Sequence, residues 1–294
     1  MKPNSKFKGL VLEFWANIKL LNQRLGYAER RTKKNPSPGF VIPSVSQIQK
    51  VFKDEGLNPS RLVDGGQLTA FGELIQEYME YRGNALQNHV EPLLMKKDEA
   101  KKLFDQQKAK LKPSCPLPLN KQKGAKKDYA FLTGLVNMLI EANKGDFTCD
   151  YDPRELTALT VDRFPVRTLS RRVDGAFPSI KDPIAIWEIK EYYYTTTFGS
   201  RVADGVYETQ LDGWELWEAK TNLNRTVQHY LIVDDHYTWW TCGRSYLCRL
   251  VDSMHMGLVT EVIFGKEVIE RIPALVKEWT YGYGGEQLSI ATEP

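Results

Sequence analysis

The spacing of apolar residues predicts a mainly helical first third of the chain. Apolar side chains recur every three or four residues over 7–25, which makes one stripe of an amphipathic helix. A second helix is expected over 46–56, where the Ser46 hydroxyl can cap the free N–H groups and Gln49 reaches back. A third is expected over 68–81. The pattern therefore indicates three short helices.

The segment between the second and third helices has the order of a small wing. It contains a short apolar stretch, the Gly65-Gly66 turn and the start of the third helix. This order is typical of a winged-helix or helix-turn-helix module, in which the helix from Ser46 would enter a DNA groove and present Gln47, Gln49 and Lys50. A plain helical bundle without a DNA-reading role gives the same pattern, so both interpretations stay open.

A linker is expected over 104–126, because three prolines and many lysines fall there among few apolar residues. Proline lacks an N–H donor and disfavours helix at the residue before it, which predicts an extended, exposed segment. The chain would then divide into a basic helical domain over 1–103 and a second domain over 127–294.

After the linker the pattern alternates between helix and strand, the order of an α/β domain. Short runs with period two predict strands, and runs with period three to four predict helices. The four tryptophans of this part, Trp214, Trp217, Trp239 and Trp240, are expected mainly in the core. The expected helices are 128–143, 207–223, 246–256 and 266–281, and the expected strands are 172–177, 184–191, 229–235, 239–242 and 259–264.

Charge changes this picture, because the formal net charge of +3 hides an asymmetry. Residues 1–127 carry an excess of basic side chains (net +12), and residues 128–294 carry an excess of acidic ones (net −9). A basic half suggests a polyanion partner, and an acidic half suggests carboxylates gathered for a purpose such as metal binding. Two ordinary solvated surfaces would give the same totals.

Composition excludes several classes of protein. A chain with 42% hydrophobic and 26% charged residues is globular and not disordered throughout. No run of about 18 apolar residues is present, so neither a membrane span nor a membrane partner is expected. Four scattered cysteines without a C-x-x-C pair favour a reduced protein of the cytoplasm. The glycines of YGYGGE follow a helix, which predicts a flexible tail and no nucleotide cofactor.

The segment with the most chemical information joins Asp174 to the triplet Glu188-Ile189-Lys190. Side chains alternate along a strand, so Glu188 and Lys190 share one face, and strand pairing can bring Asp174 beside Glu188. Two carboxylates and the carbonyl of Ile189 form a hard-oxygen site that suits Mg²⁺, with Mn²⁺ as a substitute. Lys190 would orient the attacking water and stabilise developing phosphate charge.

These residues resemble the PD-(D/E)XK nuclease superfamily, and within it the type II restriction endonucleases. Asp174, Glu188 and Lys190 match the acidic residues and lysine of that motif, whereas Val173 stands where the pattern has proline. The resemblance covers about 127–264 and implies a restriction-endonuclease-like mixed sheet flanked by helices. It also implies two auxiliary candidates, Glu141 on the preceding helix and Gln210 on the following one. Gln210 matches only part of a Gln-x-x-x-Tyr pattern, because Trp214 stands where the pattern has tyrosine.

The motif alone has little specificity, because Asp204 and Glu218-Ala219-Lys220 repeat its spacing. That second triplet has helical periodicity, so its acid and lysine diverge by about 200°. The alternation in IAIWEIK favours the first triplet. The competing interpretation is a surface salt bridge between Glu188 and Lys190 on an exposed sheet face.

The resemblance implies a Mg²⁺-dependent, sequence-specific endonuclease that hydrolyses phosphodiester bonds of duplex DNA. If it cuts both strands, one site per chain implies a homodimer. Two alternatives remain: a structure-specific repair, recombination or transposon-end nuclease, and a non-catalytic DNA-binding protein on a degenerate nuclease fold. DNA contacts are expected from side chains of a basic loop, the second helix and the segment after the catalytic strand. These are Arg30, Arg31, Lys33, Lys34, Gln47, Gln49, Lys50 and Arg201.

Overall fold

The fold was obtained as a computed structural model of all 294 residues. The structure describes residues 1–29, 32–33, 35, 38–120, 128–194 and 199–291, and side chains as far as residue 282. The expected basic-loop residues Arg30, Arg31 and Lys34 lie outside the described residues. So do 121–127 of the expected linker.

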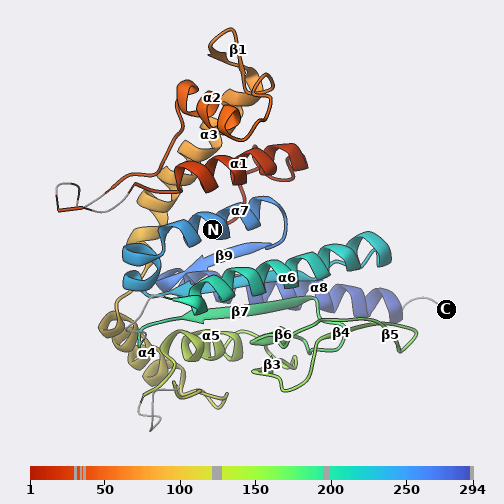
Figure 1. The fold of residues 1–294 in the computed structure, drawn as a ribbon. Coiled ribbons are helices and arrows are strands. Elements are labelled where there is room, and N and C mark those ends of the chain that lie inside the picture. Colours follow the sequence, from red (N-terminus) through yellow and green to blue (C-terminus); the bar gives the residue numbers. More distant parts are fainter. Residues whose placement is uncertain (30–31, 34, 36–37, 121–127, 195–198, 292–294) are drawn as a thin grey trace.

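Three helices and a two-stranded hairpin build the N-terminal part of the protein (Figure 1). They enclose a core of aromatic and aliphatic side chains centred on Phe14, Ile18 and Tyr78, all fully buried. The hairpin turns at Gly65 and Gly66, both with positive φ, as the Gly-Gly sequence predicts. The elements are α1 (Leu12–Leu25), α2 (Val45–Asp54), β1 (Val63–Asp64), β2 (Gln67–Leu68) and α3 (Ala70–Ala85).

The boundaries of these helices differ from the sequence predictions. The helix α2 is capped by Ser44 and not by Ser46: the Ser44 hydroxyl accepts from the Gln47 N–H, and the Gln47 side chain accepts from the Ser44 N–H. Two serines two residues apart offer the same cap, and the sequence does not decide between them. Residues 7–11 precede α1 as turn and extended backbone, and Leu68 belongs to β2.

The expected linker is wrong for residues 104–111, which continue a helix. This helix, α4 (Lys97–Leu111), follows the short turns Leu86–Val90 and Glu91–Leu93. Phe104 is fully buried and packs against Phe131 and the Cα of Gly134, where a Cβ would lie 2.4 Å from the Phe104 ring. Burial of this ring outweighs the polar composition around it. Extended backbone begins only after Lys112, which ends the helix in the left-handed conformation.

A five-stranded mixed sheet forms the centre of the second half (Figure 1). The strand order is β3-β6-β7-β8-β9, with antiparallel pairs up to β7 and parallel pairs from β7 onward. Helices connect the parallel strands, as such crossovers require. The sheet strands are β3 (Asp150–Tyr151), β6 (Gly175–Phe177), β7 (Ala185–Glu191), β8 (Gln228–Asp234) and β9 (Glu261–Phe264).

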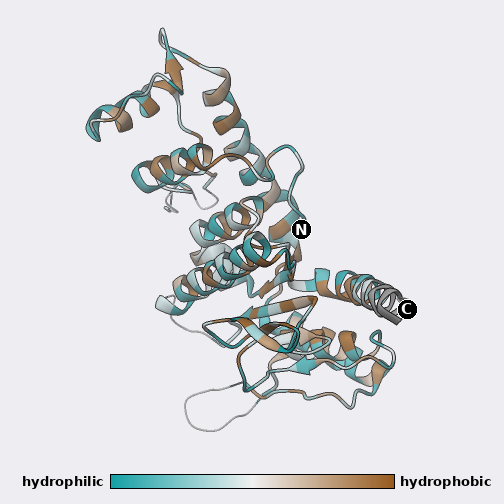
Figure 2. Cartoon of the chain, turned by 90° about the vertical axis from the view of Figure 1, so that its right-hand side faces the viewer, coloured by the Kyte–Doolittle hydropathy of each residue, from teal (hydrophilic) through white to brown (hydrophobic). Residues whose placement is uncertain are grey.

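Helices cover both faces of this sheet. On one face α5 (Phe131–Glu141) and α8 (Val268–Ala291) bury Trp187 and Ile189 of β7. On the other face lie α6 (Ser200–Leu223) and α7 (Arg244–His255), which pack on Leu231 and Val233 of β8 and on Ile186 of β7. Hydrophilic and hydrophobic residues alternate along these helices in Figure 2. The α/β prediction for this half is confirmed.

Four features of the second half were not predicted or were predicted wrongly. A hairpin of β4 (Ala158–Val161) and β5 (Phe164–Thr168) stands outside the main sheet. The expected strand over 239–242 is instead part of the helical turn His236–Cys242. The residues after Tyr281, expected as a tail, continue α8 as far as Ala291, and a short turn, Gly265–Glu267, precedes that helix. Trp239 and Trp240 are buried, but Trp214 and Trp217 are 42% and 51% exposed, against the expected core placement.

A buried ion pair connects the two halves. The Arg82 guanidinium of α3, with no exposed surface, lies 2.8 Å from the Asp252 carboxylate of α7. Tyr78 and Asn22 complete the shell, since Tyr78 donates to Asp252 and Arg82 donates to the Asn22 side-chain oxygen. A buried charge is tolerated only when it is paired and hydrogen-bonded, so α1, α3 and α7 are held in one arrangement. Over the described part of the chain, no helix is long and apolar enough to span a bilayer.

We expect Asp252→Ala to lower the free energy of unfolding by about 3–5 kcal/mol, because it leaves the Arg82 charge buried without a partner. Urea denaturation measures the change. Glu13→Ala is the matched control: it also removes the carboxylate partner of an arginine, Arg61, but at an exposed pair, and should leave the midpoint nearly unchanged. Equal effects of the two substitutions would contradict the role of the buried pair.

Candidate functional site

Strand β7 places Glu188 and Lys190 on the face of the sheet that α6 covers. Trp187 and Ile189 point to the opposite face and enter the core beneath α5 and α8, as the alternation predicts. Lys190 Nζ lies 3.0 Å from Glu188 Oε2, and Glu188 has no exposed surface. The pair is therefore largely buried under α6, which differs from a salt bridge on an exposed sheet face.

Asp174 lies beside these residues, directly before β6. Its backbone N–H donates to the Trp187 carbonyl, and its side-chain Oδ2 accepts from the Ile189 N–H at 2.7 Å. Antiparallel pairing of Gly175 with Trp187 fixes this position. A Cβ on Gly175 would lie 2.1 Å from the Trp187 ring, so only glycine fits next to Asp174. The three motif residues are thus brought together.

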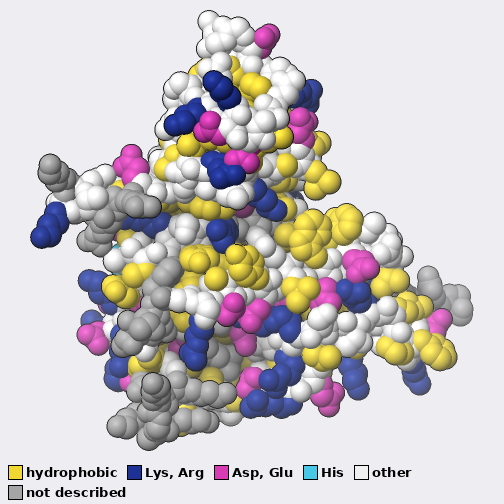
Figure 3. Space-filling model, in the orientation of Figure 1, with side chains coloured by type: hydrophobic (Ala, Val, Ile, Leu, Met, Phe, Trp, Pro, Cys, Tyr) yellow, Lys and Arg dark blue, Asp and Glu magenta, His cyan; other side chains and the backbone are white. Residues whose placement is uncertain are grey.

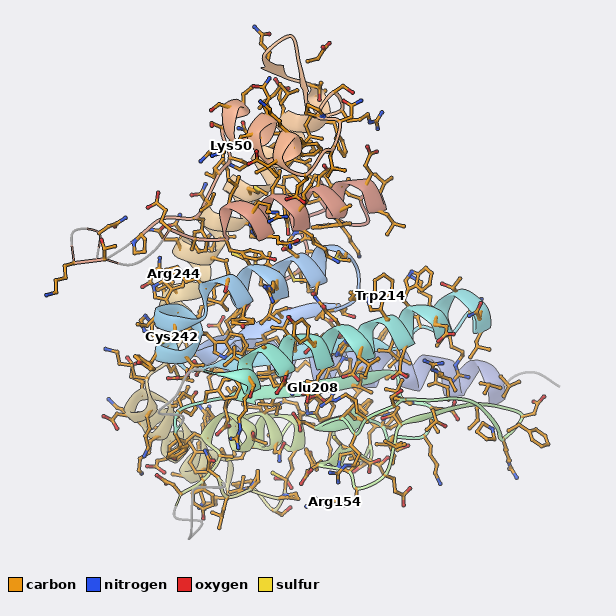
Figure 4. The ribbon with its side chains drawn as sticks, viewed as in Figure 1. Lys50, Arg154, Glu208, Trp214, Cys242 and Arg244 are labelled. Atoms are coloured by element: carbon orange, nitrogen blue, oxygen red, sulfur yellow. The ribbon has the colours of Figure 1, made fainter. Side chains whose placement is uncertain are left out.

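Three further charged residues complete the cluster, and sequence reasoning missed all of them. Arg171 Nη1 lies 2.9 Å from Glu188 and 2.5 Å from Asp212, while Lys190 Nζ lies 2.8 Å from Glu208. Glu208 and Asp212 are one turn apart on α6, so they face β7 together. Figure 4 shows Glu208 between α6 and β7. The i, i+4 spacing of two acids on a helix after the motif strand was the available signal.

The carboxylates of the cluster differ in their affinity for protons. Burial, and then the nearby Glu188 charge, raise the pKa of Asp174 to about 7. Burial also raises the pKa of Asp212 to about 7. The pKa of Glu188 is lowered despite its burial, because Lys190 and Arg171 hold positive charge against it, and these carboxylates in turn raise the pKa of Lys190. Lys190 therefore remains an ammonium ion at neutral pH.

A cleft of about 500 Å³ opens on one side of the cluster. Its basic side chains, Arg154, Arg171 and Arg172, surround the exposed side of Asp174. Arg154 lies on the lower side of the molecule in Figure 4, beneath the sheet. Positive charge in a concave surface attracts anionic ligands, and arginine is suited to phosphate. The remaining lining residues are Asp152, Leu156, Ser170 and Val173.

The two auxiliary candidates lie elsewhere. Glu141 accepts hydrogen bonds from the Ser114 N–H and hydroxyl, which lowers its pKa and fastens the chain after α4 to the end of α5. The expected role of Glu141 in facing a metal is not supported by these contacts. Gln210 donates to the Ser253 hydroxyl of α7, so it serves the packing of α6 on α7. Glu191, also on β7, points to the other face, where Thr133 donates to it.

The described residues of the expected DNA-contacting set lie at the surface, on α2, in the loop before α2 and at the start of α6. Gln49 and Lys50 are exposed on α2, whereas the Gln47 side chain is engaged in the helix cap. Lys33 is exposed in the loop before α2, and Arg201 is exposed at the start of α6. Exposure is compatible with DNA contact but does not select it.

The donor set of the cluster suits a hard cation that keeps much of its own water. Two buried oxygens, Glu188 Oε1 and Asp212 Oδ1, have no hydrogen-bond donor among the described residues. Glu188 Oε1 is close to Arg171, but at an angle that does not make a hydrogen bond. Across the described chain, no three His, Cys, Asp or Glu side chains are placed to hold a metal together. Mg²⁺ commonly binds through one or two carboxylates plus substrate phosphate and water, so Asp174 and Glu188 are the residues of this cluster that could hold such an ion.

Comparison with known families gives two matches. Residues 95–279 match the model of a domain of unknown function (DUF7687), and residues 1–89 match the model of another (DUF7690). No curated protein and no solved structure matches the chain. The boundary between the two matches falls at the turns between α3 and α4.

We expect Asp174→Asn to stabilise the protein more at pH 8 than at pH 4, where the effect is the change in the free energy of unfolding caused by the substitution. The folded-state pKa of Asp174 is raised to about 7, so the proton bound in the folded state contributes stability that is complete below the unfolded pKa and is lost as the pH rises through 7. Asparagine removes this loss and can still accept from the Ile189 N–H.

Urea denaturation between pH 4 and pH 8 measures this difference. Asp152→Asn, at an exposed carboxylate lining the same cleft, is the control and should show no such trend. If the gain in the free energy of unfolding caused by Asp174→Asn does not increase from pH 4 to pH 8, a raised pKa at Asp174 is ruled out.

Proposed function

We propose that this chain, which belongs to the DUF7687 family, is a metal-dependent nuclease that hydrolyses phosphodiester bonds of DNA. The observation that carries the proposal is the meeting of Asp174, Glu188 and Lys190, of which Asp174 lines an arginine-rich cleft. Paired carboxylates beside an ammonium group match the needs of phosphodiester hydrolysis, in which negative charge grows on the phosphate oxygens. In the chain, α5 precedes the strands of the main sheet and α6 connects β7 to β8. This order, together with the strand order β3-β6-β7-β8, supports a restriction-endonuclease-like arrangement.

Each residue has a role that follows from its surroundings. Lys190, charged at neutral pH, would stabilise the developing phosphate charge and orient the attacking water. Asp174, with a pKa of about 7, can exchange a proton near neutral pH. The oxygen of water bonds to phosphorus and the water loses a proton to solvent, while the ester P–O bond breaks and the leaving oxygen takes a proton from solvent. A bound Mg²⁺ would supply Lewis-acid stabilisation of the phosphate and a lower pKa for the water.

Arg171 extends this proposal beyond the motif. Its guanidinium lines the cleft and is partly exposed, while it also contacts Glu188 and Asp212. It can therefore bind a phosphate oxygen from the cleft side and hold Glu188 in position from the other. Arg172, exposed in the same cleft, offers a second contact to the DNA backbone.

The substrate is proposed to be duplex DNA read by the basic N-terminal half, as in a type II restriction-like endonuclease. The net charge of +12 over residues 1–127 supports a polyanion partner for that half. The hairpin and α2 give it the elements of a small DNA-reading module, with Gln49 and Lys50 on the outer side of the helix.

One observation favours a second candidate, a non-catalytic DNA-binding protein. Arg171 and Lys190 already neutralise Glu188, and such full compensation is also what a purely structural buried ion cluster needs. The two functions differ in whether Mg²⁺ and duplex DNA give cleavage products. Discrete bands from unmethylated plasmid or phage DNA would favour a sequence-specific enzyme, and junction-dependent products would favour a repair or recombination nuclease.

We expect Asp174→Ala, Glu188→Gln and Lys190→Ala to reduce Mg²⁺-dependent cleavage by at least about 100-fold, because each removes a group that stabilises charge in the transition state. Glutamine at 188 keeps the shape of the side chain and an oxygen that can still accept hydrogen bonds from Arg171 and Lys190, which remain paired with Asp212 and Glu208. Cleavage of end-labelled duplex DNA, with sequencing of the ends, measures the loss.

Glu218→Ala is the matched control, because Glu218-Ala219-Lys220 repeats the acid-x-lysine spacing on α6 at an exposed position. It should cut at the wild-type rate. Circular dichroism and thermal melting confirm that each variant folds. Undiminished cleavage by folded Glu188→Gln protein would refute the assignment of this site.

A further inference from the structure

A second cavity, of about 680 Å³, is lined by the C-terminal half of α6, the start of β8 and the turn that joins α7 to β9. Residues before α1 also contribute to its lining. Gly213 lets α6 approach the turn, because a Cβ at this position would lie 2.5 Å from the Leu258 carbonyl oxygen. None of the lining residues belongs to the charged cluster or to the arginine-rich cleft. The cavity has the size of a small-molecule site.

Positive charge prevails around this cavity, although most of the lining comes from the acidic half of the chain. Four basic side chains and two acidic ones line it, a net charge of +2: Lys2, Lys8, Lys220, Arg271, Glu261 and Glu278. The acids balance two of the cations, since Arg271 contacts both of them and Lys2 lies 4.0 Å from Glu278. Lys8 and Lys220 are exposed, and neither has an ion-pair partner among the described residues. Two unpaired ammonium groups at one cavity favour an anionic ligand.

An aromatic ring is available at the same cavity. Trp217 of α6 lines the cavity and is 51% exposed, and Trp214 contacts its indole edge to face at 5.8 Å between ring centroids. Figure 3 shows hydrophobic side chains gathered over α6. Leu216 and Val227, both buried, add apolar surface to the lining. An indole that keeps half of its surface exposed offers a stacking partner to a planar ring such as a nucleobase.

One buried polar side chain of the lining, His229 on β8, has a ring nitrogen without a partner. His229 Nδ1 lies 2.9 Å from the Leu258 carbonyl oxygen, which can only accept, so Nδ1 carries the proton and Nε2 is an acceptor. Burial lowers the pKa of His229, which keeps the ring neutral at neutral pH. No donor among the described residues reaches Nε2. Because buried polar atoms are normally hydrogen-bonded, this acceptor favours a ligand with an N–H group.

We propose that this cavity binds a free mononucleotide. The base would stack on Trp217 and donate from an amino group to His229 Nε2, and the phosphate would be held by Lys8 and Lys220. Adenine, cytosine and guanine all carry such an amino group. A simple anion would use the lysines alone, and an uncharged aromatic molecule would leave them unpaired. Negative charge, a planar ring and an N–H donor occur together in a nucleotide, which therefore accounts for all three features of the lining.

Isothermal titration calorimetry of the full chain with AMP, without DNA or metal, tests this inference. We expect a dissociation constant on the order of 10–100 μM, and weaker binding of adenosine and of inorganic phosphate, because each has only some of the recognised groups. Trp217→Ala should weaken AMP binding at least about 10-fold without changing the affinity for phosphate. Lys220→Ala should weaken the binding of AMP and phosphate and leave that of adenosine unchanged. Tyr207→Ala is the matched control, since Tyr207 is an exposed aromatic residue of α6 outside the cavity.

His229→Asn tests recognition of the base separately. The asparagine amide can still donate to the Leu258 carbonyl, but it has no acceptor at the position of Nε2. We expect this variant to bind AMP at least about fivefold more weakly and to bind phosphate as the wild type does. Circular dichroism and thermal melting establish whether it folds. If it does not, Trp217→Ala decides the matter, because Trp217 is half exposed and its removal leaves the core intact.

Absence of AMP binding at millimolar concentration would overturn the inference. Phosphate bound as tightly as AMP would also overturn it, since the cavity would then be an anion site only. A 5′-phosphorylated oligonucleotide that displaces AMP and binds more tightly, with Lys220→Ala weakening both, would overturn it as well by identifying a nucleic-acid strand as the occupant.

This inference goes beyond the proposed nuclease activity and does not depend on it. The cavity shares no residue with the charged cluster, and AMP binding is measured without cleavage. A chain that binds AMP but does not cut DNA would refute the proposed function alone, whereas an active nuclease that does not bind AMP would refute this inference alone.

Discussion

A carboxylate with no exposed surface stays ionised only when positive groups are held against it, and the architecture of the second half follows from this constraint at Glu188. Arg171 comes from the segment before β6, and Lys190 comes from β7 itself. Arg171 and Lys190 in turn contact Asp212 and Glu208 of α6. The charge of one side chain thus ties two strands and the covering helix into a single electrostatic unit, and that unit lies where β6 and β7 meet the arginine-lined cleft.

The same physics joins the remaining parts of the chain. Arg82 and Asp252 pair in the core between α3 and α7, and the buried Asp234 at the end of β8 accepts hydrogen bonds from the Met95 N–H and the Tyr193 hydroxyl. Apolar burial supplies most of the stabilising free energy, but it is not directional. Buried polar contacts are directional, so they fix the relative positions of the helical half, α4 and the sheet.

The sequence predicted those parts of the fold in which a local pattern decides the outcome. The alternation from Ala185 to Glu191 gave β7 and its two faces, and the Gly65-Gly66 pair gave the first hairpin. Where tertiary burial overrides composition, prediction failed: Phe104 extends α4 into the expected linker, and buried Trp239 belongs to a helical turn rather than a strand. Competing local signals also misled, since Ser44 and Ser46 offer the same cap.

The candidate site shows the same division between local and distant information. Asp174, Glu188 and Lys190 were predicted because the last two share a strand and the first precedes its partner strand. Arg171 was missed because its partners stand 17 and 41 residues away along the chain, and no period connects them. Glu141 was expected near the metal by position alone, whereas its real partner, Ser114, depends on how the chain returns after α4.

The acidic groups of the cluster outnumber the basic ones, and this excess of negative charge favours a bound cation. Four carboxylates, those of Asp174, Glu188, Glu208 and Asp212, surround two cations, those of Arg171 and Lys190. If all were ionised, two negative charges would remain in excess in a partly buried space. Burial, followed by the charge of Glu188, raises the pKa values of Asp174 and Asp212 to about 7, and protonation of both would remove that excess. A single divalent cation would remove the same excess without a proton, and it would do so beside a cleft whose arginines are suited to phosphate.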